Sequence, residues 1–443
     1  MTKRQRTLLF FAAATLFLLT TPAVVLYSQG WRVDWDHKTV THTGGVYVRV
    51  TPPRASIFVD DGFVKRTDFF FDSALITDLL PGEYHLRIEK EGYIPWKKTL
   101  SVQSSQVTEA KEVILFPNTI AFQALFSSIK HVWPSPDTST YIFQKQINSN
   151  SWELISWNSQ NKKETVLLFE TSNSTSIENI TWSEDSRNIL VEISRNEKPQ
   201  YLIWDLTGQE TDVCVRTPCD LDFLTSSISN VVFSPLNSKE VIFTTSVASS
   251  SVLQKTDYVT RQKPIVFAQD VVSFTTEGRK LLWLDQKGMI WEKNLSSDGL
   301  SIAVTQQPYV VEPETKYTII TNGSTHLLEE ISNSVSSYLE SPDKKKLAFV
   351  DNSRLIVFFF ETKKQVLLGT LTQAPKSLSW LGNEHVFFSL EDSINVAELD
   401  ARGTSNIVQL GTFKNPELSW NLEQKSLFVL SEGKFLVSEK LLP

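Results

Sequence analysis

The sequence predicts an all-β protein that follows a single N-terminal transmembrane helix. Three observations support this fold class. Residues 8–27 form a charge-free apolar run, residues 43–117 hold short alternating runs between Gly and Pro turns, and one turn pattern recurs seven times across residues 118–443. A chain of 443 residues is long enough to bury more than one core. We therefore expect a small β-domain followed by a larger domain built from repeats.

The composition is that of a folded protein. Hydrophobic residues make up 41% of the chain and charged residues 21%, which is typical of globular domains. The formal net charge is −7, and no basic stripe follows the first few residues. Because nucleic-acid binding needs a basic surface, we exclude nucleic acid as a partner.

The N-terminal segment predicts where the rest of the chain lies. Three basic residues, Lys3, Arg4 and Arg6, precede the apolar run 8–27. A helix of about 20 residues spans about 30 Å, the thickness of a bilayer core, and a basic flank stays in the cytoplasm. We expect residues 1–7 to be a cytoplasmic tail, the run to be a single-pass helix in the cell membrane, and the bulk of the chain to be extracytoplasmic.

A cleaved signal peptide is the alternative to this anchor. Thr21-Pro22-Ala23 offers a weak cleavage site with small residues. The apolar run continues past that site through Leu26. This favours an uncleaved anchor, which we expect to be followed by a linker over residues 28–42.

Residues 43–117 are typical of a small antiparallel, sandwich-like β-domain. The alternating runs VYVRV and ASIFVDD flank a Pro52-Pro53 turn. An Asp61-Gly62 dipeptide follows, which tight hairpins favour because it tolerates positive φ. Leu86 and Ile88 alternate with charged residues, which indicates one buried and one solvated face.

These residues resemble the PEGA domains of prokaryotic surface proteins. The resemblance rests on TPPRASIFVDDG, on LLPGEYHLRIEKEGY and on the Pro-Trp that follows. In the tetrapeptide that gives the family its name, Pro52 and Ala55 match the ends, whereas Pro53 and Arg54 replace Glu and Gly. The resemblance implies a β-sandwich-like module of envelope proteins, without catalysis.

Tyr93 and Trp96 lie at the end of this stretch, just after Gly92. Two exposed rings would suit the stacking of a sugar. The alternative is that Gly92 takes a left-handed bend and both rings close the core. We expect the second arrangement.

One pattern recurs seven times after residue 118. It has a turn position, an apolar residue three positions earlier, an aromatic residue one position earlier in five copies, and an apolar residue seven positions later. The turn positions are Ser135, Ser183, Ser234, Thr275, Ser341, Leu381 and Asn421. The later apolar positions are Ile142, Leu190, Val241, Leu282, Ala348, Phe388 and Phe428.

This repeat predicts a seven-bladed β-propeller over residues 118–443. Four strands in about 40 residues is the period of one propeller blade. The turn resembles those of WD-repeat-like and TolB-like propellers of envelope proteins. The interval from Thr275 to Ser341 is longer, at 66 residues, and its segment 311–330 is either a long outer hairpin or an insertion.

The last repeat predicts how the ring closes. From Leu418 the chain supplies three strands and then ends, while residues 119–126, TIAFQALF, have no place in the first blade. Open sheet edges invite unwanted pairing. We therefore expect this N-terminal strand to complete the last blade.

Two cysteines, Cys214 and Cys219, lie close together in VCVRTPCD. A structural zinc site takes four ligands, and no neighbouring His or Cys supplies the others. A local disulfide is expected if the region lies in an oxidising compartment. The alternative is a pair of free, buried thiols.

The sequence predicts a binding function rather than catalysis. It contains no G-x-S-x-G, no phosphate-binding Gly loop and no H-E-x-x-H, so we predict no catalytic, cofactor-binding or metal-ligating residues and no cofactor. We expect a membrane-anchored, extracytoplasmic, non-enzymatic binding or scaffold protein of the prokaryotic cell envelope. Its partner would be an envelope protein or, second, a cell-wall polysaccharide, because repeated rigid units usually serve as display surfaces.

The rival hypothesis is an enzyme. Propellers also support catalysis, and a lyase or hydrolase acting on envelope polysaccharide would place its site in the central channel. Carboxylates, His or Tyr meeting at one mouth of the channel would indicate such an enzyme.

Overall fold

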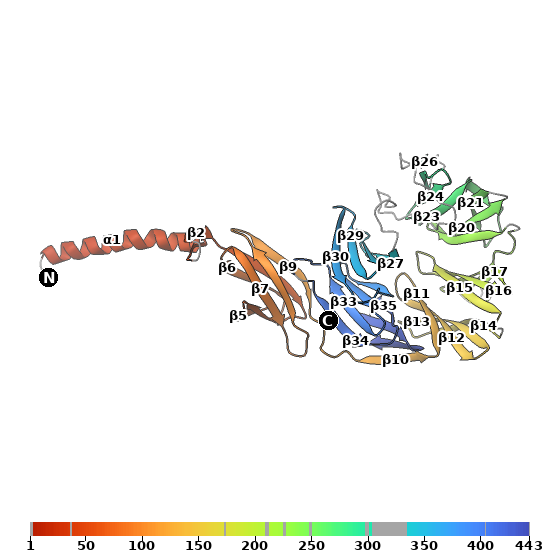
Figure 1. The fold of residues 1–443 in the computed structure, drawn as a ribbon, viewed down its shortest axis with the longest axis horizontal. Helices are drawn as coiled ribbons and strands as arrows, with labels where there is room; N and C mark the ends of the chain where they lie inside the picture. The colour runs from red at the N-terminus through yellow and green to blue at the C-terminus, as the bar shows by residue number, and fades with distance from the viewer. Residues whose placement is uncertain are drawn as a thin grey trace.

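The computed structural model describes residues 3–35, 38–171, 174–208, 212–224, 227–247, 250–296, 301–303, 335–403 and 405–442. Figure 1 shows a helix at the N-terminal end, then a small β-domain, then a group of sheets at the other end. Helix α1 (Lys3–Ser28) covers the predicted apolar run. It is long and apolar enough to cross a membrane, and its apolar stretch is not buried in the protein. The segment 311–330 lies outside the described residues.

A two-stranded hairpin follows the helix, where a linker was expected over residues 28–42. Its strands are β1 (Trp31–Asp34) and β2 (Thr39–His42). The reason is a short alternation of large apolar and polar residues, Trp-Arg-Val-Asp-Trp, which favours a strand. Five alternating residues were too few to predict it.

The small β-domain consists of two sheets packed on one core. The first sheet has the order β6-β3-β9 and the second the order β5-β4-β7-β8. The strands are β3 (Gly44–Thr51), β4 (Ser56–Val59), β5 (Gly62–Arg66), β6 (Ser73–Leu79), β7 (Gly82–Glu89), β8 (Trp96–Val102) and β9 (Val107–Ile114). Leu86 and Ile88 are buried as the alternation predicts, and they pack in the core with Val46, Ile57 and Leu100.

One pairing differs from the expected antiparallel fold. Strands β3 and β9 run parallel. Strand β8 returns the chain to the end at which β3 begins, where Gly45 N–H donates to the carbonyl of Gln106. Because β9 starts at that end, it runs in the same direction as β3. The sequence pattern shows strands but not which end of the domain each one starts from.

The turns of the small β-domain explain two sequence features. Gly92 has a φ of +83°, as expected for a left-handed bend, and Trp96 is buried in the core with Tyr93 packed against it. Arg54 stands where the family tetrapeptide has Gly, and its φ is +61°. Its guanidinium lies over the ring of Phe69, 4.3 Å from the centroid. Arg54 therefore adopts the left-handed conformation that Gly adopts most readily.

The described residues after the small β-domain form seven four-stranded antiparallel sheets, which we number first to seventh. The first three are β11 (Ile129–Pro134), β12 (Thr140–Asn148), β13 (Ser151–Asn158) and β14 (Glu164–Glu170); β15 (Thr175–Trp182), β16 (Asn188–Arg195), β17 (Lys198–Asp205) and β18 (Cys219–Asp220); and β19 (Ile228–Ser234), β20 (Asn237–Val247), β21 (Ser250–Asp257) and β22 (Ile265–Ala268). The fourth and fifth are β23 (Val271–Glu277), β24 (Lys280–Asp285), β25 (Ile290–Asn294) and β26 (Ile302–Ala303); and β27 (Val335–Glu340), β28 (Lys346–Asp351), β29 (Arg354–Phe359) and β30 (Lys364–Thr370). The sixth and seventh are β31 (Leu378–Leu381), β32 (His385–Ser389), β33 (Ser393–Glu398) and β34 (Ile407–Thr412); and β35 (Glu417–Asn421), β36 (Ser426–Ser431), β37 (Lys434–Ser438) and β10 (Phe122–Ser127).

The repeated pattern matches these sheets. Each predicted turn position lies at or next to the end of the first strand of a sheet, except that Thr275 lies within β23. All seven of the apolar residues that follow by seven positions are at most 3% exposed, on the second strand. The pattern therefore marks the first turn and the buried second strand of every sheet.

In the first, second and fifth sheets, the turn between the first two strands is held by a Ser and an Asp two residues later. The hydroxyls of Ser135, Ser183 and Ser341 donate to Asp137, Asp185 and Asp343 at 2.5–2.6 Å. Each hydroxyl also accepts from the backbone N–H five residues on. These turns touch their neighbours, since Asp137 N–H donates to the hydroxyl of Ser186 at 3.2 Å and Asp343 N–H to Asn383 at 3.1 Å. The motif is therefore structural, and it links adjacent sheets.

The N-terminal strand pairs where it was expected. Strand β10 lies antiparallel to β37 as the outermost strand of the seventh sheet. Hydrophobic clusters of described residues join six pairs of sheets: first with second, second with third, third with fourth, fifth with sixth, sixth with seventh, and seventh with first. Between the first and seventh sheets, for example, Phe143 meets Phe435 with ring centroids 4.8 Å apart. In the described part of the chain, no such cluster spans the fourth and fifth sheets.

Candidate functional site

Charged side chains meet where the small β-domain touches the sixth sheet, and we call this group the Lys98 cluster: Lys98, Trp96, Glu398, Asp400 and Asn406. The Lys98 side chain is fully buried, and it forms an ion pair with Glu398, whose side chain is 7% exposed. Lys98 also donates to the carbonyl of Asp400. Trp96 Nε1 and Asn406 Nδ2 donate to the Glu398 carboxylate at 2.7 and 2.9 Å. This carboxylate therefore has three donors, two of them from the small β-domain.

The alternation of β8 places Lys98 in this cluster. Residues Trp96, Lys98 and Leu100 are buried in turn, while Lys97 is exposed. An unpaired ammonium at such a position would carry a large desolvation cost. Glu398, at the end of the wholly buried strand β33, supplies the compensating charge.

A second set of contacts extends the junction. Arg402 pairs with Asp400 at 2.6 Å and donates to the backbone carbonyl of Glu109 at 2.7 Å. Hydrogen bonding with Asp400 raises the pKa of Arg402. For Asp400, burial raises the pKa, but the hydrogen bonds from Arg402 and the charge of Lys98 outweigh it and lower the pKa overall. Both groups stay charged at neutral pH.

A cavity of about 210 Å³ lies beside the Lys98 cluster. His385, Glu384 and Phe359 line it from the sheets, and Glu112 and Val113 from the small β-domain. His385 is buried. Its pKa is lowered to about 4, mainly by burial and to a smaller extent by repulsion from Lys98. The ring is therefore neutral at pH 7.

A larger groove of about 610 Å³ lies along the first strands of the sixth, seventh and first sheets. Its lining includes Val132, Lys376, Ser377, Glu417 and Ser419. Glu417 is the one carboxylate among its lining residues, and partial burial raises its pKa. Lys376 donates to Asn415 at 2.5 Å at the same groove. A volume of this size suits a side chain or a small ligand.

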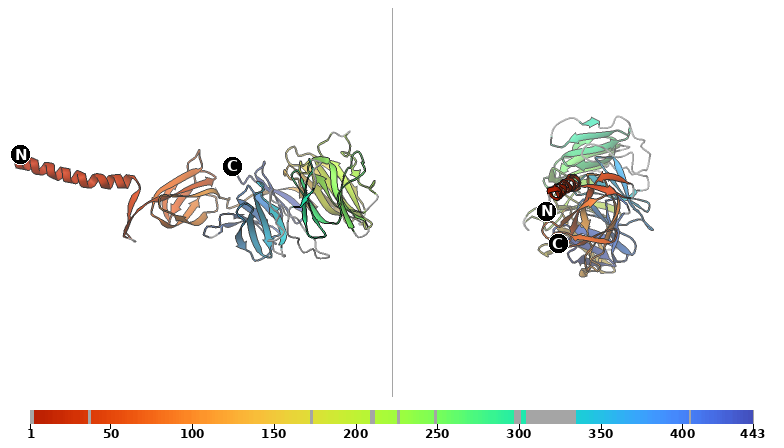
Figure 2. Two further views of the ribbon diagram at one scale, coloured as in Figure 1. Left: turned by 90° about the horizontal axis from the view of Figure 1, so that it is seen from above. Right: turned by 90° about the vertical axis from the view of Figure 1, so that its left-hand side faces the viewer.

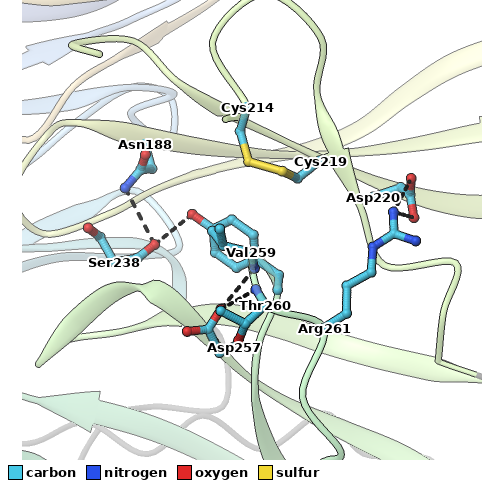
Figure 3. Close-up of a disulfide and its surroundings, with 10 residues drawn as sticks. Asn188, Cys214, Cys219, Asp220, Ser238, Asp257, Val259, Thr260 and Arg261 are labelled. Atoms are coloured by element: carbon cyan, nitrogen blue, oxygen red, sulfur yellow. Dashed lines mark hydrogen bonds and ion pairs between the residues drawn. A yellow bond between two sulfur atoms is a disulfide. The ribbon is translucent and has the colours of Figure 1, made fainter. Parts of the chain in front are cut away.

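Cys214 and Cys219 are joined by a disulfide (Figure 3). Cys214 is buried between the second and third sheets, in a cluster that includes Tyr258 and Phe243. Tyr258 donates to the carbonyl of Ser238 at 2.8 Å, and burial raises its pKa. The disulfide therefore closes a loop that covers a junction between sheets.

The carboxylates at the domain junction are paired, since Glu398 and Asp400 each have a cationic partner. Among the described residues, no group of three or more His, Cys, Asp or Glu side chains is placed to hold a metal ion.

No sequence pattern predicted the Lys98 cluster. The one local sign in the sequence is that Lys98 lies at an inward-facing position of an alternating strand, where an apolar residue is expected. Its partner Glu398 is 300 residues away in the sequence, so no local pattern connects the two.

Comparison with known proteins identifies the small β-domain. Residues 43–114 match the PEGA domain family. No curated protein matches the chain. Among solved structures, the β-propeller domain of Myceliophteria thermophila Cps50 (Swd1) is 11% identical, with a TM-score of 0.42 over 73% of this chain and 99% of that one. A chain of a mitotic checkpoint complex is 12% identical, with a TM-score of 0.42 over 74% of this chain and 93% of that one.

Proposed function

We propose that this chain is a membrane-anchored, extracytoplasmic binding scaffold of the cell envelope. In this proposal α1 spans the membrane, the PEGA-like domain is a spacer, and residues 118–443 form a seven-bladed propeller that displays its loops to an envelope protein. The Lys98 cluster is the observation that carries the proposal. A buried, multiply bonded ion pair holds the spacer against the sheets, so a partner bound by the propeller is held at a defined place relative to the anchor.

Closure of the propeller needs contact between the fourth and fifth sheets, and the side chains there support it. Leu281 and Trp283 pack toward the third sheet. The alternating residues Leu282 and Leu284 therefore point to the other side, and both are fully buried. On the fifth sheet, the buried face of Leu347, Phe349, Ile356 and Phe358 lies opposite the face that packs on the sixth. Two apolar faces of this kind are complementary.

A binding role agrees better than catalysis with the groove along the first strands. Its lining holds one carboxylate, Glu417, and the ionic groups at the domain junction pair with each other. We therefore propose a non-enzymatic protein.

Photo-crosslinking in intact cells tests the partner. A crosslinking residue at Lys376, exposed beside the groove, is compared with one at Lys364, exposed on the outermost strand β30. We expect a discrete protein adduct from position 376 and none from 364. A protease-resistant adduct containing sugar would favour polysaccharide as the partner, and no adduct from any displayed loop would contradict the scaffold.

Proteolysis of cells stripped of their outer layers tests the orientation. An added protease should remove the chain beyond α1. Full protection would mean that the bulk of the chain lies on the cytoplasmic side.

A further inference from the structure

The hairpin β1–β2 has one apolar and one polar face. Its cross-strand pairs are Trp31 with His42 and Val33 with Val40 on one face, and Arg32 with Thr41 and Asp34 with Thr39 on the other. The apolar face is open, since Val33 is 46% and Val40 59% exposed. Trp35, next to the tip, is 82% exposed.

The polar face is fixed to the rest of the protein. Arg32 pairs with Asp78 on β6 at 2.6 Å. The same guanidinium lies 3.5 Å from the centroid of the Tyr27 ring and donates to the carbonyl of Tyr27 at 2.7 Å. Asp34 is buried on this face. The hairpin is therefore held at the end of α1, with its polar side against the small β-domain.

This placement sets the direction of the apolar face. The small β-domain and α1 lie on opposite sides of the hairpin, and the hairpin stands out sideways from the end of the helix (Figure 2). Arg32 on the polar face contacts both Asp78 of the small β-domain and Tyr27 in the last turn of α1. The apolar face is therefore the one left open, beside the end of the helix. That helix has exposed apolar side chains from Leu8 to Tyr27.

We infer that the β1–β2 hairpin lies on the membrane surface and inserts Trp35, Val33 and Val40 into the interfacial layer of the lipid. This inference rests on the proposed membrane anchoring by α1. Trp and Tyr favour the membrane–water interface because they combine an apolar ring with a polar group. Tyr27 in the last turn of α1 and Trp31 at the start of β1 flank the junction between the helix and the hairpin. The apolar face continues the apolar surface of the helix, so one lipid surface covers both. With the hairpin on the membrane surface, the small β-domain has a fixed tilt relative to the membrane and does not rotate freely about the end of α1.

Single-cysteine labelling tests this in the full chain, reconstituted in phosphatidylcholine–phosphatidylglycerol vesicles. Both native cysteines form the disulfide, so a cysteine at Trp35, Val40 or Thr39 gives one free thiol for an environment-sensitive fluorophore. Thr39 is the matched control, because it neighbours Val40 but lies exposed on the polar face. We expect a blue-shifted emission at 35 and 40, quenching by lipid-attached nitroxides, and a several-fold loss of iodide quenching relative to 39.

A fourth label at Leu18, inside α1, separates the two proposals. Lipid quenching at 18 with iodide quenching at 35 and 40 would overturn the hairpin inference and leave the anchor standing. Iodide quenching at 18 would overturn the anchor. If neither quencher reaches the labels at 35 and 40, a protein covers this face of the hairpin. If lipid-attached nitroxides quench the label at 39 as strongly as those at 35 and 40, the whole hairpin is immersed in lipid without a preferred face. Both results contradict the inference. The Val40 variant alone decides the matter if the Trp35 variant misfolds.

Discussion

At the scale of single residues, His385 makes the domain junction sensitive to pH. Its pKa is lowered to about 4 in the folded chain, whereas an unfolded His titrates near 6.5. The folded pKa is the lower one, so the stabilising effect of the neutral ring is present above pH 6.5 and is lost as the pH falls toward 4. Between pH 6.5 and 4.5 the loss is about 2–3 kcal/mol.

We therefore predict that His385→Gln weakens the pH dependence of stability. Urea unfolding of the detergent-solubilised chain at pH 7 and pH 5 measures it. Between pH 7 and pH 5 the native chain should lose more stability than the variant. In the native chain, His385 is protonated in the unfolded state at pH 5 but stays neutral and buried in the folded state, whereas Gln does not titrate. Identical pH profiles would mean that His385 is solvated.

At the scale of elements, the Ser-x-Asp turn fixes the connection between the first two strands of the first, second and fifth sheets. Asp137 accepts from the hydroxyls of Ser135 and Ser139 and from the N–H of Ser139. Burial raises the pKa of Asp137, but these hydrogen bonds outweigh it and lower the pKa overall. The carboxylate therefore contributes stability above its unfolded pKa, and this contribution is lost as the pH falls below about 4.

Replacing this carboxylate tests the turn. Asp137→Ala leaves the Ser135 hydroxyl and the Ser139 N–H without their acceptor, so we expect a loss of about 1–3 kcal/mol at pH 7. Asp137→Asn keeps one acceptor oxygen and should lose less. Denaturant midpoints at pH 7 and pH 3 measure both. If both variants match the native chain at pH 7, the turn motif does not stabilise the first sheet.

Elements with a repeated pattern could be predicted, and single ones could not. Seven copies of one pattern located the buried second strand of each sheet, because the same residues recur at the same distance. The β1–β2 hairpin occurs once and has short strands, so its pattern was not distinguishable from a linker. The parallel pairing of β3 with β9 depends on where β8 ends in space, which no local pattern records.

At the scale of the whole molecule, the Lys98 cluster should make the two β-domains melt together. Lys98→Met removes one partner and leaves Glu398 buried, which typically costs about 3–5 kcal/mol. We expect calorimetry to resolve two transitions in this variant and one in the native chain. The double variant Lys98→Met, Glu398→Leu removes both charges and should recover much of the loss. If Lys98→Met still melts in one transition at the native temperature, the junction is held by other contacts.

The pairing of β10 with β37 couples the two ends of the repeat region, and proline can test it. Glu439 N–H donates to the carbonyl of Ala121 at 2.9 Å, so the next hydrogen-bonded pair of the antiparallel ladder is Gln123 with Val437. The N–H of Phe122 points away from β37 in this alternation. Proline at 123 therefore removes a hydrogen bond between β10 and β37, whereas proline at 122 removes none.

Thr165→Pro is the matched control for Gln123→Pro. Strand β14 is also outermost in its sheet, and Asn158 N–H donates to the carbonyl of Lys163 at 2.9 Å, which makes Ser156 and Thr165 the next bonded pair. Each proline removes one N–H and fixes φ. Freeing β14 exposes one edge of the first sheet, whereas freeing β10 also separates the last sheet from the start of the repeat region. We expect a lower melting temperature for Gln123→Pro than for Thr165→Pro, and equal small shifts would mean that β10 is only a connecting segment.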